Sequence, residues 1–353
     1  MPLLTFRAEN FRCLEDITLD ADPKYNLIHG ANASGKTSLL EGLAYLGRGK
    51  SFRGAPTTNL VRHGQQQFVL FGEAQRGDHT SRIGLRNGRE GLEIRIDGQP
   101  GANTAALAER LPLQIIDPDI HDLVAAGPEN RRRYLDWIAF HVEHGFLPEW
   151  QAFRRALKQR NAALKGTGEG LDAWNAEFVE RGLKVDAARR ATLKKSVEAL
   201  EKQGLSLLGS AVRYEYRSGW GQEQTLAEAL DAGAERDLQQ GSTQAGPHRA
   251  DIRLIVDERQ ARRLVSRGQQ KLLACAMILA ATDVVQQHQK EPMLLLLDDP
   301  AAELDTDSLA RLMEQVFALG SQLVVTALDP TALIFPQQPA VFHVERGELS
   351  RDQ

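Results

Sequence analysis

Residues 30–37 read Gly30-Ala31-Asn32-Ala33-Ser34-Gly35-Lys36-Thr37 and form the most informative segment of the chain. It has the G-x-x-x-x-G-K-[ST] spacing of a P-loop, in which glycines let backbone N–H groups turn inward toward phosphate oxygens. Strand-forming residues at 26–28 precede the loop and helix-forming residues at 38–46 follow it, as the motif requires. The sequence therefore predicts that these eight residues bind a nucleotide, with Lys36 neutralising the β- and γ-phosphates and Thr37 offering its hydroxyl to Mg²⁺.

Two carboxylates follow an apolar run in the C-terminal part of the sequence. Residues 293–297 form a short hydrophobic segment, typical of a buried parallel strand, just before Asp298. Ligands of open α/β sheets bind at the carboxyl ends of such strands. We predict that Asp298 holds Mg²⁺ through water and that Asp299 polarises the attacking water, so both are catalytic candidates. The alternative is that one Asp only caps the turn at Pro300.

A third segment, Ser266-Arg267-Gly268-Gln269-Gln270, precedes an apolar stretch with helical character at 271–285. Ser is a favourable helix N-cap, and Gly268 permits close approach of the backbone to a ligand. The helix dipole would then point at a γ-phosphate, so Ser266, Gly268 and Gln269 are nucleotide-binding candidates and Ser266 is also a catalytic one. The pentapeptide alone is weak evidence because Ser-capped helices are common, but its position shortly before the double-Asp strand strengthens the prediction.

In this fixed order the three segments resemble the P-loop, signature and Walker B motifs of ABC-type ATPases, and residues 301–305 resemble their D-loop. The resemblance implies that the signature contacts the nucleotide of a second subunit, so that one chain holds only half of each active site. The sequence departs from the ABC pattern at Asp299, where Glu is usual, and at Thr326, where a switch His is common. The shorter carboxylate at position 299 suggests slow hydrolysis.

Further runs of sequence resemble the RecF family of SMC-related ATPases, and together they extend over essentially the whole chain. They are Glu9-Asn10-Phe11-Arg12, the run at 47–53, Gly127-Pro128 followed by the run at 131–136, and the run at 246–251. The sequence departs from the family's pattern at Ala126 and Ser308, where Gly and a basic residue are usual. Neither departure lies in a nucleotide motif, so both leave the ATP-binding prediction unchanged.

The RecF resemblance implies an α/β fold: an ABC-type ATPase head with an antiparallel β lobe and an inserted helical arm, using ATP and Mg²⁺. It implies an ATP-dependent homodimer that binds DNA at junctions of single and double strands, as in gapped duplexes. It also implies action with RecO and RecR, which loads a recombinase and supports the SOS response. Arg12 would reach the nucleotide phosphates by the same resemblance, and an ordinary surface arginine is the alternative.

The character of the sequence changes twice along the chain. Residues 1–125 have strand and turn patterns around the P-loop helix, with strands of an antiparallel lobe expected at 67–73 and 92–96. Residues 126–210 are helical, with a turn expected at 166–170. Strand patterns return at 211–353, with strands expected at 213–216, at 251–256 and before Ser266. One long helix is expected at 171–209, roughly 60 Å in length. The P-loop strand and the double-Asp strand must share one sheet. We therefore predict that the helical segment is an arm inserted between two parts of one head.

The composition excludes several classes of protein. The chain has 353 residues, 42% of them hydrophobic, which suits one large or two modest globular domains. Its two cysteines are too few for a disulfide framework, and no zinc-type Cys/His spacing occurs. The longest apolar stretch, 272–281, is about half as long as a membrane helix, and the first residues lack a signal-peptide pattern. We expect a cytoplasmic, nucleoid-associated protein.

Charge is distributed unevenly along the chain. The net charge is −4, but residues 151–200 contain eleven basic and six acidic side chains, which gives +5 there and −9 for the remainder. A locally basic surface can bind a phosphate backbone although the whole chain is acidic. The alternative is a solvated helical face. The segment offers no series of aromatic residues for base stacking, which argues against sequence-specific recognition of single strands.

Other functions compete with that of a DNA-binding ATPase. The nucleotide-binding subunit of an ABC transporter would share all three motifs, but its P-loop and signature are usually closer than the 230 positions between Lys36 and Ser266. A structural DNA-binding scaffold with a degenerate ATP site is another alternative. A chance P-loop match occurs about once in a hundred chains of this length. A dinucleotide cofactor is disfavoured because the G-x-G-x-x-G fingerprint is absent.

Overall fold

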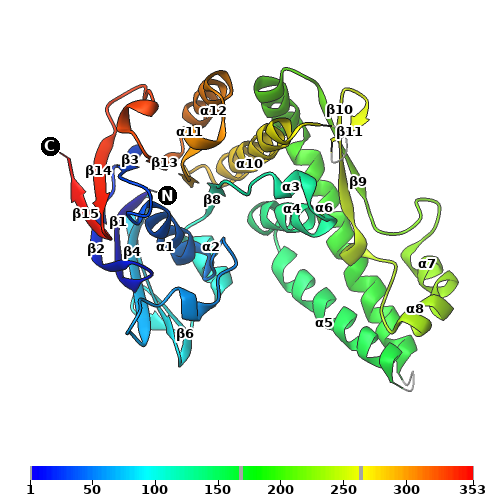
Figure 1. Ribbon diagram of the computed structural model, residues 1–353. Helices are drawn as coiled ribbons and strands as arrows, with labels where there is room; N and C mark the ends of the chain where they lie inside the picture. The colour runs from blue at the N-terminus through cyan, green and yellow to red at the C-terminus, as the bar shows by residue number, and fades with distance from the viewer. Residues whose placement is uncertain (1, 167–169, 262–264, 353) are drawn as a thin grey trace. The chain divides into compact units, whose positions relative to one another are not determined.

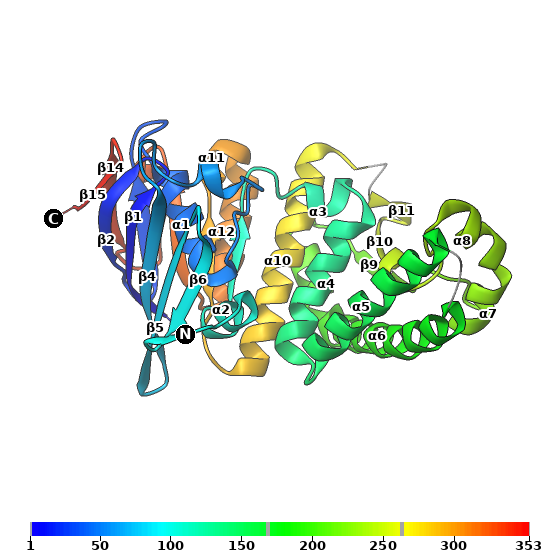
Figure 2. The same cartoon turned by 90° about the horizontal axis from the view of Figure 1, so that it is seen from below.

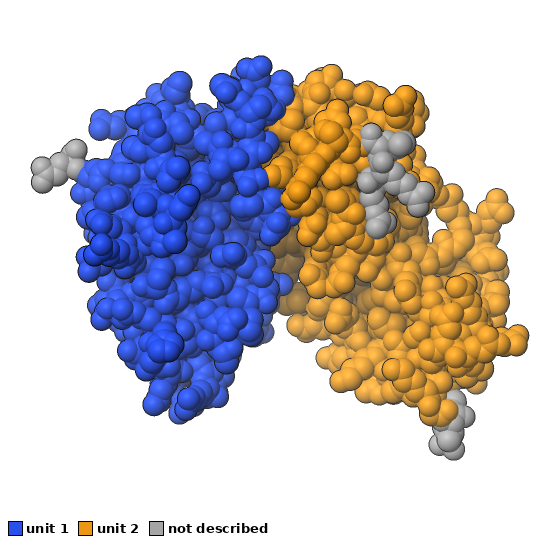
Figure 3. Space-filling view, viewed as in Figure 1, with its two compact units in different colours: residues 1–120, 289–353 blue, residues 121–288 orange. Residues whose placement is uncertain are grey.

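The computed structural model describes residues 2–166, 170–261 and 265–352. The chain forms two compact units, which Figure 3 distinguishes by colour. Unit 1 contains residues 1–120 and 289–353, and unit 2 contains residues 121–288. Residues 211–288, with the signature segment, belong to the same unit as the predicted arm. The functional division into a head and an arm inserted at 126–210 stays a prediction.

A six-stranded sheet with the order β15-β14-β3-β13-β12-β8 forms the centre of unit 1 (Figure 1). Neighbouring strands are parallel except for the pair β14–β15. β12 and β13 are buried along their whole length, which explains why their sequences are mostly apolar rather than alternating. The P-loop strand β3 and the double-Asp strand β12 share this sheet, as predicted, with β13 between them. The strands are β3 (Tyr25–His29), β8 (Leu113–Ile116), β12 (Leu294–Leu297), β13 (Gln322–Ala327), β14 (Ala340–Glu345) and β15 (Glu348–Arg351).

A second sheet, antiparallel and with the order β2-β1-β4-β5-β6-β7, forms the β lobe of unit 1 and confirms the strands predicted at 67–73 and 92–96. Helix α1 (Lys36–Arg48) contacts both sheets, and Figure 2 shows it beside β1 and β4. Its leucines join one core cluster with residues of both sheets, such as Phe6 and Leu296. This burial fixes the helix whose N-terminus follows the P-loop. The strands are β1 (Leu3–Phe11), β2 (Leu14–Asp20), β4 (Gln67–Arg76), β5 (His79–Gly88), β6 (Gly91–Ile96) and β7 (Gln99–Pro100).

Short helices complete unit 1. Of these, α12 (Thr306–Ala318) begins after Asp305, whose side chain accepts a hydrogen bond of 2.9 Å from the Ser308 amide. This cap satisfies a helix N–H group that would otherwise lack a partner. The others are α2 (Thr104–Arg110), α11 (Pro300–Glu303) and the 3₁₀ turns η1 (Thr57–Asn59) and η3 (Pro330–Ala332).

Unit 2 is mostly helical, and its helix α6 (Leu171–Leu208) confirms the long helix predicted at 171–209. The 38 residues of α6 correspond to about 57 Å, and the helix ends at Gly209 in the left-handed conformation. α5 (Phe146–Lys165) packs along α6. The turn expected between them falls mostly on residues 167–169, outside the described residues. The other helices are α3 (Asp122–Ala125), α4 (Pro128–Val142), α7 (Leu226–Ala232), α8 (Ala234–Gln240), η2 (Pro247–Arg249) and α10 (Arg267–Gln289).

A small antiparallel sheet with the order β11-β10-β9 also belongs to unit 2. Its strands β9 (Val212–Arg217) and β10 (Asp251–Val256) confirm the strands predicted at 213–216 and 251–256. β11 (Arg259–Gln260) follows, and the remainder of the strand expected before Ser266 falls on residues 262–264, outside the described residues.

Two of the RecF-like runs meet inside unit 2. The Arg131 side chain is 3% exposed, and its Nε donates to Asp251 Oδ1 over 2.7 Å. Its Nη1 donates to the main-chain carbonyl groups of residues 123, 124 and 126. Arg132 donates to the Ala250 carbonyl over 2.8 Å. The runs at 131–136 and 246–251 are therefore joined to each other, and a structural role explains their residue types.

We predict that Arg131→Ala lowers the free energy of unfolding of unit 2 by about 3 kcal/mol, because Asp251 loses its buried partner and three carbonyl groups lose a donor. Arg133→Ala is the matched control, since Arg133 forms only an exposed pair with Glu129, four residues away on the same helix. Urea unfolding followed by circular dichroism measures both. Equal effects of the two substitutions would contradict the structural role of Arg131.

Candidate nucleotide site

The P-loop curls tightly between β3 and α1. Gly30 has φ 153°, and a Cβ atom there would lie 2.3 Å from the Val344 carbonyl oxygen. Gly35 has φ 122°, and a Cβ atom there would lie 3.2 Å from Cys13 Sγ. The Ser34 carbonyl accepts a hydrogen bond of 2.8 Å from the Gly347 amide. Glycine is required at both positions, because the loop is pressed against the chain that surrounds it.

Donors converge where the loop enters α1. The Lys36 side chain is buried, and its ammonium donates to the carbonyl groups of Gly30 over 2.7 Å and Ala31 over 3.0 Å. The buried hydroxyl of Ser34 has no hydrogen-bond partner among the described residues. No described side chain caps the N-terminus of α1. A helix N-terminus without a cap, an unpartnered hydroxyl and an ammonium group together fit a phosphate group.

Two hydroxyl groups hold Asp298, the first acid of the pair, by hydrogen bonds. Asp298 Oδ1 accepts hydrogen bonds from the Thr37 hydroxyl over 3.1 Å and from the Thr326 hydroxyl over 2.9 Å. The same Thr326 oxygen accepts a hydrogen bond from the Asp299 amide over 2.9 Å. Thr326, at the position where a switch His was expected from the ABC pattern, is fully buried and therefore positions both acids.

The oxygen atoms of Thr37 and Asp298 are the ligand type that Mg²⁺ prefers. The described residues contain no group of three or more His, Cys, Asp or Glu side chains that could hold a metal ion. The Thr37 and Asp298 oxygens nevertheless fit Mg²⁺, because this ion is usually bound by one or two carboxylates together with substrate phosphates and water, rather than by a complete protein cage.

The second acid, Asp299, is the N-cap residue of α11 and has a left-handed backbone with φ 46°. Burial raises the pKa of Asp299, and the nearby Lys36 ammonium opposes this change. Burial also raises the pKa of Asp298, while the hydrogen bonds from Thr326 and Thr37 oppose it because they favour the ionised form. Both carboxylates thus ionise less readily than exposed ones, which is typical of catalytic clefts.

A third carboxylate, Asp117, lies at the same edge of the sheet. β8 pairs with β12 in parallel register, so that Ile116 is opposite Leu297, and the Asp298 amide donates to the Ile116 carbonyl over 2.9 Å. Burial raises the pKa of Asp117 to about 6, and the charges of Asp119 and Asp298 add to this effect. Asp117 was not among the predicted site residues, although this residue also follows an apolar strand.

The P-loop and the two acids Asp298 and Asp299 line one pocket of about 270 Å³. The structure brings the predicted Lys36, Thr37, Asp298 and Asp299 together there. It adds three residues that were not predicted, Cys13, Ser38 and Arg53. The Arg53 charge lowers the pKa of Asp298, so this arginine acts on the site electrostatically. The complete lining is Cys13, Asn32, Ala33, Ser34, Gly35, Lys36, Thr37, Ser38, Arg53, Asp298 and Asp299.

Arg12 does not line this pocket. Its guanidinium pairs with Glu41 of α1 through Nε and, over 2.9 Å, through Nη2. Glu41 is fully buried and also accepts a hydrogen bond of 2.5 Å from the Ser51 hydroxyl. A contact between Arg12 and the nucleotide stays a prediction, because in this structure Arg12 neutralises a buried carboxylate beneath the P-loop helix.

The signature segment caps helix α10 of unit 2. The Ser266 hydroxyl accepts a hydrogen bond of 3.2 Å from the Gln269 amide, and the Gln269 side chain accepts one of 3.0 Å from the Ser266 amide. This reciprocal arrangement is a capping box and confirms the N-cap predicted at Ser266. Ser266 and Gly268 thus lie at a helix N-terminus, a favourable place for binding an anion.

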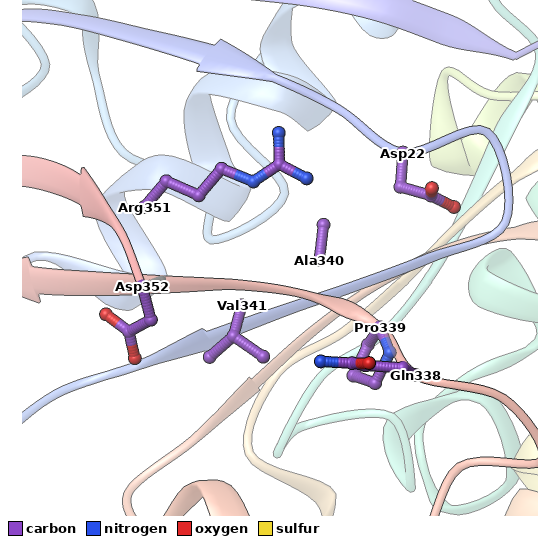
Figure 4. A pocket seen from close by; sticks show the side chains of 7 residues that line it. All are labelled: Asp22, Gln338, Pro339, Ala340, Val341, Arg351 and Asp352. Carbon is purple, nitrogen blue, oxygen red and sulfur yellow. The ribbon is translucent and has the colours of Figure 1, made fainter.

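A second groove in unit 1 has a different character (Figure 4). Its charged side chains already have partners, because Asp352 pairs with His29 over 2.7 Å and Arg351 lies over the Phe342 ring. Asp22 accepts hydrogen bonds from two amides of its own turn. We therefore assign this groove no ligand. It is lined by Asp22, Gln338, Pro339, Ala340, Val341, Arg351 and Asp352.

Comparison with known sequences agrees with this geometry. The RecF/RecN/SMC N-terminal domain family matches residues 2–348. The DNA replication and repair protein RecF of Pseudomonas fluorescens strain Pf-5 is 39% identical, over 96% of this chain and 95% of the relative. The RecF protein of Stutzerimonas stutzeri strain A1501 is also 39% identical, over 99% and 98% of the two chains.

Comparison with solved structures agrees with the sequence matches to RecF proteins. A RecF–ATP structure from the RecFOR pathway has a TM-score of 0.90 and 25% identity, and the match covers 100% of this chain and 98% of the other. An SMC head bound to a domain of ScpA has a TM-score of 0.62 at 14% identity, covering 100% and 97% of the two chains, which shows the fold alone. The fold is that of the RecF and SMC ATPase heads. The chain belongs to the RecF/RecN/SMC family and, within it, to the RecF proteins.

Cys13 provides a probe of the pocket, because it is exposed beside the P-loop while the other cysteine, Cys275, is buried. We predict that Mg²⁺–ATP slows the alkylation of Cys13 by iodoacetamide at least severalfold, since bound phosphates cover the loop. Mass spectrometry of the modified peptides measures both cysteines. The Lys36→Ala variant is the control and should lose the protection. Equal alkylation with and without ATP would place the nucleotide elsewhere.

Thr326→Val should shift the pH dependence of Mg²⁺–ATP binding. The substitution removes a hydrogen bond that favours the ionised form of Asp298, so the pKa of Asp298 rises further and binding is lost at a higher pH than in the parent. Titration with a fluorescent ATP analogue between pH 5 and pH 8 measures the shift. Thr282→Val is the matched control, because Thr282 is equally buried but donates only to a helix carbonyl. An unchanged acid limb for Thr326→Val would contradict the positioning role.

Proposed function

We propose that this protein is an ATP-hydrolysing, DNA-binding protein of recombinational repair and replication restart. The observation that carries the proposal is the convergence of Lys36, Thr37, Asp298 and Asp299 on one pocket at the N-terminus of α1. The RecF relatives, with 39% identity over nearly the whole chain, support the DNA-repair context. ATP is supported by the RecF–ATP structure that the chain resembles.

The residues of the pocket have different roles in ATP hydrolysis. The P-loop amides, Gly30 to Thr37, bind the phosphates, and Lys36 neutralises the β- and γ-phosphates. Thr37 and Asp298, already in contact over 3.1 Å, hold Mg²⁺, which polarises the phosphate oxygens when bound. Asp299 orients the attacking water. Its side chain is shorter than the Glu usual at this position, which is consistent with slow turnover.

The signature completes the site from a second copy of the chain. In this proposal Ser266, Gly268 and Gln269 of one protomer close over the γ-phosphate bound to its partner, so that ATP binding favours the dimer and hydrolysis releases it. The N-terminus of α10, where these residues form a capping box, offers the positive end of a helix dipole. Because each site then needs two chains, ATP acts as a timer for the residence of the dimer on DNA.

DNA is the macromolecular substrate in this proposal. The dimer binds junctions of single- and double-stranded DNA, as in gapped duplexes, and acts with RecO and RecR to load a recombinase and to support the SOS response. The RecFOR pathway in the name of the similar RecF structures supports this partner set. A place on the nucleoid follows from binding DNA.

The comparisons favour this function over that of a transporter subunit. The relatives with near-complete coverage are DNA replication and repair proteins. In the part of the chain that the structure describes, no helix has the length and apolar character needed to cross a membrane. A DNA-binding scaffold with an inactive ATP site would bind DNA equally well after loss of ATP binding, which a DNA-binding assay on Lys36→Ala can exclude.

A mixing experiment tests the shared site. Lys36→Ala removes the phosphate-binding ammonium, and Ser266→Arg blocks the signature, so each variant alone should hydrolyse no ATP. A mixed dimer contains one intact site, made from the P-loop of one variant and the signature of the other. An equimolar mixture should therefore recover about a quarter of the parent turnover, because half of the dimers are mixed.

The matched control is a mixture of Lys36→Ala with Asp298→Asn, which places both lesions on the P-loop side and should recover nothing. Recovery is measured as phosphate release at saturating ATP. If the first mixture stays as inactive as its components while both variants remain folded by circular dichroism, each site lies within one chain and the shared-site proposal is wrong.

A further inference from the structure

Most of the excess positive charge at 151–200 is neutralised within unit 2. Arg160 pairs with Asp237 over 2.8 Å in a fully buried contact, and Arg189 pairs with Asp136 over 2.7 Å. Four more basic residues on α6 pair with carboxylates of neighbouring turns or helices. These are Arg181, Lys184, Arg190 and Lys195. Six of the eleven basic side chains are thus explained by folding.

Four of the remaining basic residues lie together on α5. Arg154, Arg155, Lys158 and Lys165 are exposed, and none forms an ion pair with a described carboxylate. Arg154, Lys158 and Lys165 are spaced by four and seven residues, which places them on one face of the helix. The opposite face, with Phe153 and the other buried residues of α5, packs inward. We call these four residues the α5 basic face.

The α5 basic face borders an open groove of about 730 Å³ that no acidic side chain lines. The acid nearest in the helix, Glu149, is engaged by Arg181 of α6 over 3.0 Å and cannot neutralise the face. Arg154 lies over the Trp150 ring with 5.2 Å between guanidinium and ring centre, which holds this side chain in place. The groove is lined by Arg154, Arg155, Leu157, Lys158, Asn161, Ala162 and Lys165.

Asn161 adds a fixed donor to the groove. Its side-chain oxygen accepts hydrogen bonds from the Thr243 amide over 2.9 Å and from the Thr243 hydroxyl over 2.7 Å. The amide nitrogen of Asn161 therefore faces away from Thr243 and has no acceptor among the described residues. A row of cations with a neutral N–H donor between them matches the oxygens of successive phosphates.

We propose that the α5 basic face binds the sugar–phosphate backbone of DNA. The inference rests on the proposed function, and it adds the surface that makes the contact. The eleven residue steps from Arg154 to Lys165 rise about 16 Å along the helix axis, a distance that spans about five phosphates of one strand in a duplex. Since the groove contains no aromatic side chain on which bases could stack, the contact is with the backbone and independent of sequence.

The test compares two double variants with the same loss of charge. Arg155→Ala/Lys158→Ala removes half of the α5 basic face without touching buried groups, and Lys184→Ala/Lys195→Ala removes two exposed lysines of α6 that are already ion-paired. Binding to a fluorescent gapped duplex is followed by anisotropy with Mg²⁺–ATP across 50 to 200 mM salt. The α5 variant should bind at least about tenfold more weakly at 100 mM salt. Its slope of log K against log salt should fall by about 1.8, because each lost phosphate contact removes about 0.9.

The outcomes separate this inference from the proposed function. ATP turnover without DNA should equal that of the parent in both variants, since neither touches the pocket. If the parent binds the duplex and the α5 variant binds it with the same affinity and slope as the control variant, the α5 assignment is wrong while the proposed function stands. If the parent itself does not bind DNA, both fail. If the α5 variant keeps DNA binding but loses binding of a poly-glutamate probe, the face fits an acidic protein instead, which also overturns the proposal.

Discussion

The hydrogen bonds that Asp298 accepts from Thr37 and Thr326 are the constraint on which the site depends. They connect the first turn of the P-loop helix to the ends of β12 and β13, two strands that are distant from it in sequence. The carboxylate is buried, so it is stable as an anion only with these donors and the charge of Arg53 nearby. The parallel register of the sheet therefore determines where the Asp298 carboxylate lies as much as the motif does.

The motifs of the site were predictable because each depends on local chemistry. A P-loop needs glycines and a lysine at fixed spacing, and a metal-binding carboxylate needs a strand end, so both are visible in one stretch of sequence. Arg53 was not predicted because it reaches the pocket only through the path of the loop after α1. Asp117 was not predicted because it approaches Asp298 only through the pairing of β8 with β12. The pairing of Arg12 with Glu41 could not be predicted either, because Glu41 is buried on a helix, α1, that contacts both sheets.

In the helical region, the number of charged residues does not show which of them are free to bind a partner. The sequence showed an excess of basic residues at 151–200, but it could not tell which of them are neutralised. The structure divides them into residues that hold helices together, such as Arg160 and Arg189, and those that face solvent on α5. Likewise, the buried Arg131 forms an ion pair with Asp251, which is 120 positions away in the sequence. Long-range pairing of this kind leaves no local pattern.

We propose that this chain hydrolyses ATP as a dimer whose lifetime is coupled to DNA. The most direct measurement is the ATP turnover per chain of the purified protein over a hundredfold range of protein concentration, with no DNA, with intact duplex and with gapped duplex. We expect turnover per chain to rise with protein concentration and to increase when DNA is added, most strongly for the gapped duplex. Turnover per chain that is independent of both protein concentration and DNA would contradict this proposal.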